Sequence, residues 1–268
     1  MKFFREEGLI DEKEFNENEV QKLYDEWKTS DKNLVDFCND KGIWRYGFAE
    51  KCKKLNLYIP VNGKKFLDNK VFDSPLNEES AYWVGLLLAD GHMWKDNTGI
   101  ELGLKDKEHI EKFRTFLKSE HVIEEKTTNQ NSELYRITIQ DEYLCKRLSE
   151  LGIKNRKTYN LEISEELENP EIARHFIRGF IDGDGTLQKS YIGITSFSVE
   201  NLKLIENYIN KYYQEPHKFY YQLSENHAPD LRLYANRKQF SEWLYTESTI
   251  YLDRKYKKYL DYYAVDEE

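Results

Sequence analysis

Two apolar segments that each end in an acid and a glycine constrain the fold of this chain more than any other feature. The segments are YWVGLLLADG at 82–91 and FIRGFIDGDG at 176–185. Asp90 and Asp184 hold the same place in each, 184 − 90 = 94 residues apart. Both segments have the length and apolar content of a buried helix. A pattern repeated at this distance predicts two structural copies within one chain.

The residues after each segment repeat the same order of elements. A β-rich stretch comes first, followed by an amphipathic helix, two strands around polar turn residues, a further helix and an Arg-Lys pair. The matching stretches are 98–104 and 191–198, 106–118 and 199–213, 122–140 and 218–235, and the pairs Arg156-Lys157 and Arg254-Lys255. This order predicts an α+β fold, in which two αββαββα units form two antiparallel sheets with helices on one face. The two copies are expected over 77–165 and 166–268.

The chain before the first copy has a different character. Residues 16–57 predict helices, and Gly42 lies in a turn between two amphipathic stretches, as is typical of a helix-turn-helix. We therefore expect a small all-α unit over 1–60 and a linker over 61–76, where Pro and Gly recur. An ordinary helical hairpin with solvated lysines explains the same pattern equally well.

The distribution of charge is more informative than its sum. A formal net charge of −9 opposes nucleic-acid binding, because Lys and Arg that neutralise phosphates supply most non-specific affinity. Residues 41–65 nevertheless hold seven basic residues against Glu50 alone. Arg45, Lys51 and Lys54 would lie on the outward face of the second N-terminal helix, and we predict that they contact DNA.

Composition excludes several classes of protein. The longest apolar run, 81–89, is far shorter than the roughly 20 residues of a membrane span, and no signal peptide is expected. Three widely spaced cysteines suggest neither a zinc site nor a disulfide framework. We expect a soluble intracellular monomer, cytoplasmic in a bacterial, phage or organellar host.

Small residues recur four positions apart on both apolar helices, as Gly85 with Ala89 and Gly179 with Gly183. One narrow face of each helix therefore lacks bulky side chains, and two such faces can pack backbone to backbone. Asp90 and Asp184 would then meet at the ends of the helices. Two carboxylates at close range repel one another unless a cation lies between them. Oxygen ligands completed by water suit Mg²⁺, or Mn²⁺.

Positions 83–91 and 177–185 resemble the nine-residue signature of the LAGLIDADG homing endonucleases, in the single-chain type with two motifs. The resemblance extends over about 77–260. It implies a saddle whose two sheets lie in successive major grooves of double-stranded DNA. It also implies that the penultimate acids of the motifs, Asp90 and Asp184, bind catalytic metals, with Ala89 and Gly183 at the same metal site.

The resemblance implies further roles late in each copy and near each active site. A lysine that supports the chemistry corresponds to Lys157 and Lys255, and residues that position solvent correspond to Asp106 and Ser198. Leu88 departs from the signature, since many members have an acid there, whereas the second copy keeps Asp182. Asp106 is an unusual choice beside DNA.

These residues predict a metal-dependent endonuclease that cuts both strands of a long, non-palindromic DNA site. Phosphodiester hydrolysis needs a nucleophilic water and positive charge on the developing phosphorane, which paired metal sites supply. Polar and aromatic side chains of the sheets are predicted to read base edges. They are Arg136, Thr138, Gln140, Gln188, Lys189, Tyr220, Gln222 and Arg232.

Two other function classes stay open at this point. A catalytically silent nucleic-acid binder, either a transcription regulator or an intron maturase, fits the acidic net charge but not the retained Asp90 and Asp184. An intein with the same nuclease module is disfavoured. Met1 is not a splicing nucleophile, and the sequence ends in Val265-Asp266-Glu267-Glu268 instead of a His-Asn pair.

Overall fold

The computed structural model describes residues 15–30, 32–57, 59, 66–127, 133–155 and 161–264. Contacts divide the chain into two compact units. One comprises residues 1–69 with 114–121, and the other comprises residues 70–113 with 122–268. The domain boundaries that we expect at 60, 76 and 165 follow the sequence pattern alone and stay predictions.

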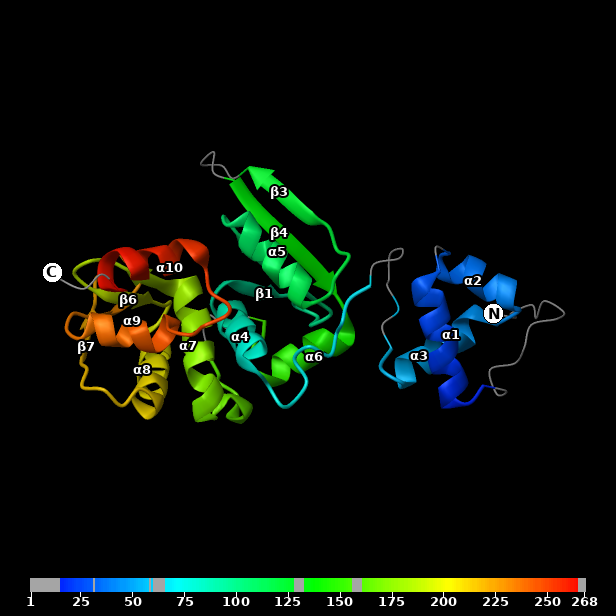
Figure 1. Ribbon diagram of the computed structural model, residues 1–268, viewed down its shortest axis with the longest axis horizontal. Coiled ribbons are helices and arrows are strands. Elements are labelled where there is room, and N and C mark those ends of the chain that lie inside the picture. The colour runs from blue at the N-terminus through cyan, green and yellow to red at the C-terminus, as the bar shows by residue number, and fades with distance from the viewer. Residues whose placement is uncertain are drawn as a thin grey trace. The chain divides into compact units, whose positions relative to one another are not determined.

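The first unit contains three short helices (Figure 1). They are α1 (Glu17–Thr29), α2 (Leu34–Lys41) and α3 (Arg45–Lys54). Gly42 ends α2 in the left-handed region at φ 64°, so the turn lies at the glycine that the sequence singled out. Apolar side chains of the three helices form the core, namely Val20, Tyr24, Trp27, Phe37, Cys38, Phe48 and Cys52.

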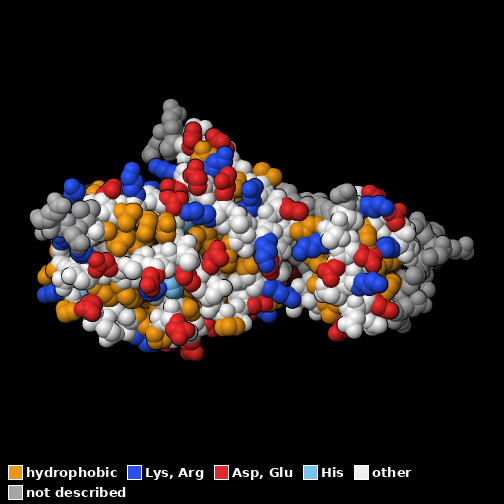
Figure 2. Space-filling view, in the orientation of Figure 1, with side chains coloured by type: hydrophobic (Ala, Val, Ile, Leu, Met, Phe, Trp, Pro, Cys, Tyr) orange, Lys and Arg blue, Asp and Glu red, His pale blue; other side chains and the backbone are white. Residues whose placement is uncertain are grey.

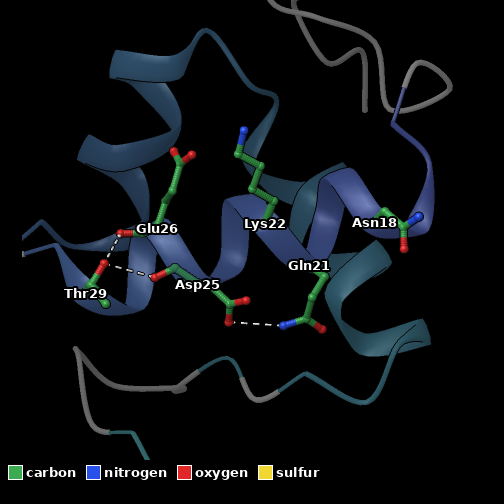
Figure 3. A pocket seen from close by; sticks show the side chains of 6 residues that line it. All are labelled: Asn18, Gln21, Lys22, Asp25, Glu26 and Thr29. Carbon is green, nitrogen blue, oxygen red and sulfur yellow. Dashed lines mark hydrogen bonds between the residues drawn. The ribbon is translucent and has the colours of Figure 1, made fainter.

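The opposite face of α1 is polar and solvated (Figure 3). Gln21 donates a hydrogen bond to Asp25 at 3.1 Å, and Thr29 donates to the backbone carbonyl oxygens of Asp25 and Glu26. These contacts join neighbouring turns of one helix. They explain how a helix with one apolar stripe presents a hydrophilic outer surface.

The two predicted copies lie in the second unit, apart from residues 114–121 of the first copy, and their elements follow the predicted order. The first copy comprises α4 (Glu78–Asp90), β1 (Gly91–Met93), β2 (Gly99–Leu104), α5 (Lys107–Phe116), β3 (Ile123–Thr127), β4 (Glu133–Gln140) and α6 (Glu142–Glu150). The second comprises α7 (Pro170–Asp184), β5 (Gly185–Leu187), β6 (Ile192–Thr195), α8 (Val199–Tyr212), β7 (Phe219–Gln222), β8 (Asp230–Leu233), α9 (Arg237–Tyr245), α10 (Asp253–Tyr259) and η3 (Leu260–Ala264). A short helix, η2 (Glu165–Leu167), precedes α7. The α+β fold class is confirmed.

Each copy has its own four-stranded antiparallel sheet. The strand orders are β1-β2-β4-β3 and β5-β6-β8-β7, so the two sheets share one topology. Along β4 and β8, buried aliphatic residues alternate with more exposed polar ones. One face of each sheet therefore belongs to the core, and the other is open to a partner. None of the described helices has the length and apolar character needed to cross a membrane.

The two motif helices, α4 and α7, pack against each other through glycines. A Cβ on Gly85 would lie 2.0 Å from the carbonyl oxygen of Phe176, and a Cβ on Gly179 would lie 1.9 Å from that of Tyr82. No side chain fits at either distance. The predicted backbone-to-backbone packing is confirmed.

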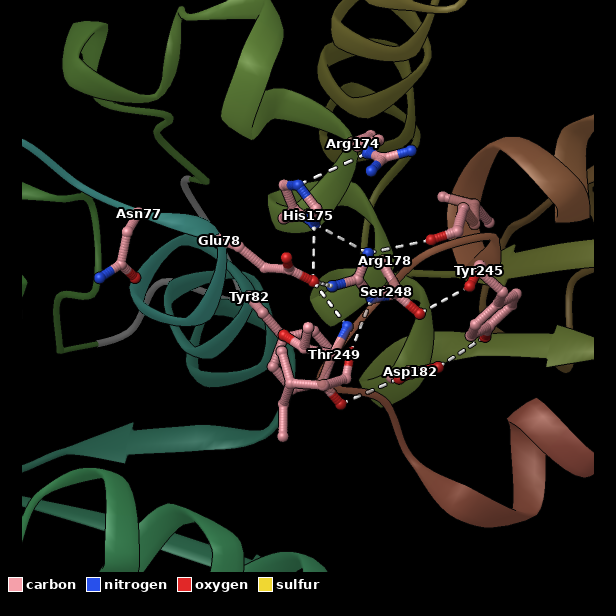
Figure 4. Close-up of polar contacts among 12 residues, drawn as sticks. Asn77, Glu78, Tyr82, Arg174, His175, Arg178, Asp182, Tyr245, Ser248 and Thr249 are labelled. Carbon is pink, nitrogen blue, oxygen red and sulfur yellow. Dashed lines mark hydrogen bonds and ion pairs between the residues drawn. The ribbon is translucent and has the colours of Figure 1, made fainter.

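A buried polar network also ties α7 to its surroundings (Figure 4). Asp182 is fully buried and accepts hydrogen bonds from the Tyr82 hydroxyl at 2.9 Å, the Tyr245 hydroxyl at 2.7 Å and the Leu252 amide at 2.7 Å. One turn earlier, the buried Arg178 donates to the carbonyl oxygens of Ile250 and Leu244 and to the Glu78 carboxylate. Buried charges are tolerated when they are paired and hydrogen-bonded in this way. The network fixes α7 against α4, α9 and the segment before α10.

Candidate active site

Asp90 and Asp184 lie at the C-terminal ends of α4 and α7. Gly183 allows these ends to approach, because a Cβ there would lie 2.4 Å from Cβ of Ala89 and 3.0 Å from Oδ2 of Asp90. Asp90 is exposed and Asp184 is half-buried. The two carboxylates thus belong to one site, reachable from solvent, at the end of the helix pair.

The Lys255 ammonium lies beneath this site. Its Nζ donates to backbone carbonyl oxygens at the end of α7, namely Ile181 at 2.6 Å, Asp182 at 2.6 Å, Gly185 at 2.7 Å and Gly183 at 3.2 Å. An ammonium has three N–H donors, so these carbonyls use its whole capacity. Positive charge is also favoured at a helix C-terminus. The contacts make Lys255 a positioning group for the helix end that carries Asp184.

Burial and the nearby carboxylates shift the pKa of Lys255 in opposite directions. Burial lowers the pKa of this lysine to about 8, although the carboxylates of Asp182, Asp90 and Asp184 favour its charged form. The side chain is only 3% exposed. Both motif acids therefore favour the charged form of one buried ammonium.

The other residues that the resemblance placed near the chemistry have local partners. Asp106 accepts a hydrogen bond from Nε of Arg254 at 2.9 Å, and the Ser198 hydroxyl caps α8 by accepting from the Asn201 amide. Lys157, with Arg156, lies outside the described residues. A solvent-positioning role for Asp106 and Ser198, and a catalytic role for Lys157, stay predictions.

The donor set at the helix ends suits a hard divalent cation. Among the described residues, no cluster of three or more His, Cys, Asp or Glu side chains could hold a metal. Mg²⁺ does not need such a cluster, because one or two carboxylates, water and substrate phosphates complete its coordination. Asp90 and Asp184 fit this pattern, with the backbone of Ala89 and Gly183 beside them. They do not fit a structural zinc site, which takes four protein ligands.

The predicted DNA-reading residues of the sheets lie outside the apolar core. Arg136, Thr138 and Gln140 alternate along β4 with buried isoleucines, and Arg232 has the same arrangement on β8. Tyr220 and Gln222 are exposed on β7, while Gln188 and Lys189 follow β5. Basic and acidic side chains are interspersed over the face shown in Figure 2.

The three basic residues predicted to contact DNA from the N-terminal unit differ in their surroundings. Lys54 is exposed, whereas the Lys51 ammonium donates to the carbonyl oxygen of Phe15 at 2.7 Å. The Arg45 guanidinium lies 4.3 Å from the ring centre of the exposed Tyr46. All three lie on α3, and their contact with DNA stays a prediction.

Part of the sequence matches a known protein family. Residues 77–162 match the sequence model described as the LAGLIDADG-like domain. This part of the chain belongs to the LAGLIDADG family. The match covers the first copy, including Asp90. The second copy lies outside the matched residues, but it repeats the sheet topology and has Asp184 at the corresponding helix end.

Solved structures show the same LAGLIDADG fold. The homing endonuclease I-WcaI, bound to its DNA recognition sequence, is 16% identical, with a TM-score of 0.50 over 77% of this chain and 97% of that chain. The N-terminal LAGLIDADG domain of DUF199/WhiA is 13% identical, with a TM-score of 0.44 over 71% of this chain and 93% of that one. At 16% identity the likeness to I-WcaI shows the fold alone, and the weaker likeness to DUF199/WhiA carries no argument.

A curated relative matches over a small part of its own length. The replication factor C small subunit of Methanocaldococcus jannaschii is 21% identical over 210 residues, which are 73% of this chain and 11% of that protein. The chain therefore spans about a tenth of that relative. The activity of the whole relative does not transfer to the LAGLIDADG copies described above.

Sequence reasoning missed the buried network around Arg178 and Asp182. The available signal was two charged residues, four positions apart, within an otherwise apolar helix. Such residues face one side of the helix and need buried partners. The partners Glu78, Tyr82 and Tyr245 lie 63 to 100 residues away, where no local pattern identifies them.

Proposed function

We propose that this chain is a metal-dependent, site-specific double-strand DNA endonuclease of the homing type. The observation that carries the proposal is the approach of Asp90 and Asp184 at the ends of two helices whose glycines pack backbone to backbone. Two carboxylates that approach each other at a solvent-reachable helix end repel one another. A divalent cation that binds both of them, together with a phosphate, would offset this repulsion.

Different residues of the chain would have different roles in hydrolysis. Asp90 and Asp184 would hold Mg²⁺ or Mn²⁺, which when bound supplies positive charge at the phosphate and lowers the pKa of a bound water. Lys255 holds the end of α7, so that Asp184 keeps its position. Lys157 is proposed for the corresponding position in the first copy. The outer faces of the two sheets bind the DNA, and the asymmetry of the copies favours a non-palindromic site cut by a monomer.

Cleavage of a randomised duplex library tests this function directly. The purified full chain is incubated with the library in Mg²⁺, in Mn²⁺ and in EDTA, and new ends are mapped by sequencing. We expect discrete double-strand ends in the two metal reactions and none in EDTA. Selective binding without ends at any metal concentration would instead support the silent regulator or maturase. If the chain neither bound the duplexes nor produced new ends, the proposal that it acts on DNA would be refuted.

The pKa of Lys255 gives a pH dependence with a definite sign. Because this pKa is about 8, the ammonium that holds the α7 carbonyls is present below pH 8 and lost above it. We expect the single-turnover cleavage rate to fall as pH rises from about 7 to about 9. Lys255→Arg keeps its charge over this range and should remove the alkaline fall, whatever its absolute rate.

The matched control for this pH profile is Lys257→Met, which removes an exposed lysine from the same helix, α10. Its profile should equal that of the unmodified chain. A fall at high pH that persists in Lys255→Arg would assign the titration to another group, such as metal-bound water.

A further inference from the structure

The two sheets carry an arginine at equivalent positions. In the first sheet, Arg136 of β4 pairs with Gly103 of β2. In the second sheet, Arg232 of β8 pairs with Gly193 of β6. Strand order is the same in both sheets, so the two arginines occupy equivalent positions in two sheets of the same topology. Their surroundings can therefore be compared position by position.

Two carboxylates surround the arginine of the first sheet. Glu101 accepts from Nη1 of Arg136 at 3.1 Å, and Glu124 accepts from Nη2 at 2.8 Å. The Trp94 indole also donates to Glu101 at 3.1 Å, which holds that carboxylate in place. Arg136 is thus held between two acids on the exposed sheet face. Its positive charge is offset by these neighbours, of which Glu124 also lies 3.6 Å from the Lys126 ammonium.

Tyrosines replace both of these acids in the second sheet. Glu101 lies two residues before Gly103, and the matching residue before Gly193 is Tyr191. Glu124 pairs with Arg136 from the edge strand, and Tyr220 pairs with Arg232 in the same way. The carboxylates that hold Arg136 therefore have no counterpart at these two positions around Arg232.

Although tyrosines stand in place of the two acids, Arg232 is still held in one orientation. Its guanidinium lies 4.4 Å from the ring centre of Tyr191, and Nε donates to Oδ2 of Asp230 at 2.8 Å. Asp230 is itself held, because its other oxygen accepts from the Thr195 hydroxyl at 2.8 Å. Gly193 gives the ring its room, since a Cβ there would lie 3.1 Å from it. An arginine fixed by a ring on one side and by a carboxylate at Nε loses little freedom when it binds.

The surface around Arg232 is aromatic and not acidic at its exposed points. Tyr220 is 44% exposed and Tyr234 is 37% exposed, and their rings lie 5.8 Å apart. The Lys218 ammonium lies 5.1 Å from the ring centre of Tyr220. Such a face favours contact with base edges and phosphates, whereas the carboxylates of the first sheet oppose it.

We propose that the two halves of the DNA target are read unequally, with Arg232 recognising a guanine through the second sheet. At the matching position in the other half, Arg136 is held by Glu101 and Glu124 and fixes no base. This inference rests on the proposed DNA binding of the sheets. Arginine binds the O6 and N7 atoms of guanine with two donors, which gives roughly 5- to 150-fold discrimination.

Binding selection separates this inference from the function on which it rests. The full chain is mixed in EDTA with a randomised duplex library, and retained duplexes are sequenced for the unmodified chain, Arg232→Lys and Arg136→Lys. Lysine keeps the charge but lacks the planar fork. We expect Arg232→Lys to reduce preference for one guanine by roughly 5- to 150-fold. Arg136→Lys should leave the profile unchanged.

Three results would overturn the inference. A guanine preference that is unchanged in Arg232→Lys would show that the guanidinium fork does not read this base. A profile relaxed by Arg136→Lys would show that the first sheet reads a base through this arginine. No enriched sequence with the unmodified chain would remove the DNA proposal and this inference together, whereas the first two results leave DNA binding standing. Thermal unfolding midpoints confirm that both variants are folded.

A gain-of-specificity variant tests the role of the acids. The double substitution Glu101→Gln and Glu124→Gln removes both charges around Arg136 but keeps an amide oxygen at each position. We expect a new guanine preference in the first-sheet half, at the position that matches the guanine read by Arg232. The matched control, Glu108→Gln with Glu215→Gln, removes two charges elsewhere and should create no such preference. A new preference in the control would attribute the effect to net charge and overturn the inference.

Discussion

Asp90→Asn and Asp184→Asn are each expected to lower the DNA cleavage rate by at least about 100-fold, because each removes a charged ligand from the cation that stabilises the transition state. Affinity for the same DNA, measured in EDTA, should change by only a few-fold, since neither acid lies on the sheet faces. Asparagine keeps the shape of the side chain, so α4 and α7 should pack as before. Cleavage of a plasmid that carries the selected target separates nicked from linear product and reports each strand.

The control for these variants is Glu165→Gln, which removes one exposed carboxylate from η2. It should cleave at the normal rate. Loss of binding and cleavage together in Asp90→Asn would assign the acid a structural role. Undiminished cleavage in both variants would place the metal elsewhere. Loss of cleavage on one strand only would show that the two acids serve separate strands.

Local periodicity made the motif helices predictable. Four-residue spacing puts Gly85 on one stripe with Ala89, and a stripe without side chains can bury itself only against another backbone. Because both copies carry such a stripe, the sequence contained both partners of the helix pair. The approach of Asp90 and Asp184 follows from that inference, whereas the fold class follows from the repeated order of helices and strands.

The surroundings of the sheet arginines were not predictable in the same way. Arg136 is polar and alternates with buried residues, so its exposure follows from the strand pattern. Its partner Glu124 is set by strand register, which depends on turn geometry and on contacts distant in sequence. The sequence suggested which residues face outward and left open which of them neutralise one another.

The lysine assignment shows a second limit. The family resemblance assigned Lys255 to the active site, and the structure places its ammonium on backbone carbonyls next to Asp184. Its donors, however, meet backbone carbonyls of α7 that no residue type reveals. Side chain to backbone contacts depend on where a helix ends in space, so a residue can lie near a site and act on it through the main chain.

Gly179→Ala is expected to destabilise the second unit by about 3 kcal/mol, at the upper end of the usual cost of overpacking. The added Cβ would lie 1.9 Å from the carbonyl oxygen of Tyr82, which belongs to the backbone of α4 and cannot rotate away. The two helices must separate, which would also move Asp90 from Asp184. For a unit of this size we expect the thermal unfolding midpoint, followed by circular dichroism, to fall by roughly 6–12 °C.

Gly103→Ala is the matched control, because it makes the same chemical change in β2, where the nearest atom to the new Cβ would be 3.8 Å away. Its unfolding midpoint should stay the same or rise slightly, since alanine restricts the unfolded chain more than glycine does. Equal midpoints for Gly179→Ala and the unmodified chain would contradict close helix packing. If Gly179→Ala lowered the unfolding midpoint strongly but still cleaved DNA at temperatures where it is folded, the glycine contact would stabilise the unit without being needed to bring the two acids together. The expected result, loss of both, would mean that the glycine contact that holds the unit together also assembles the metal site.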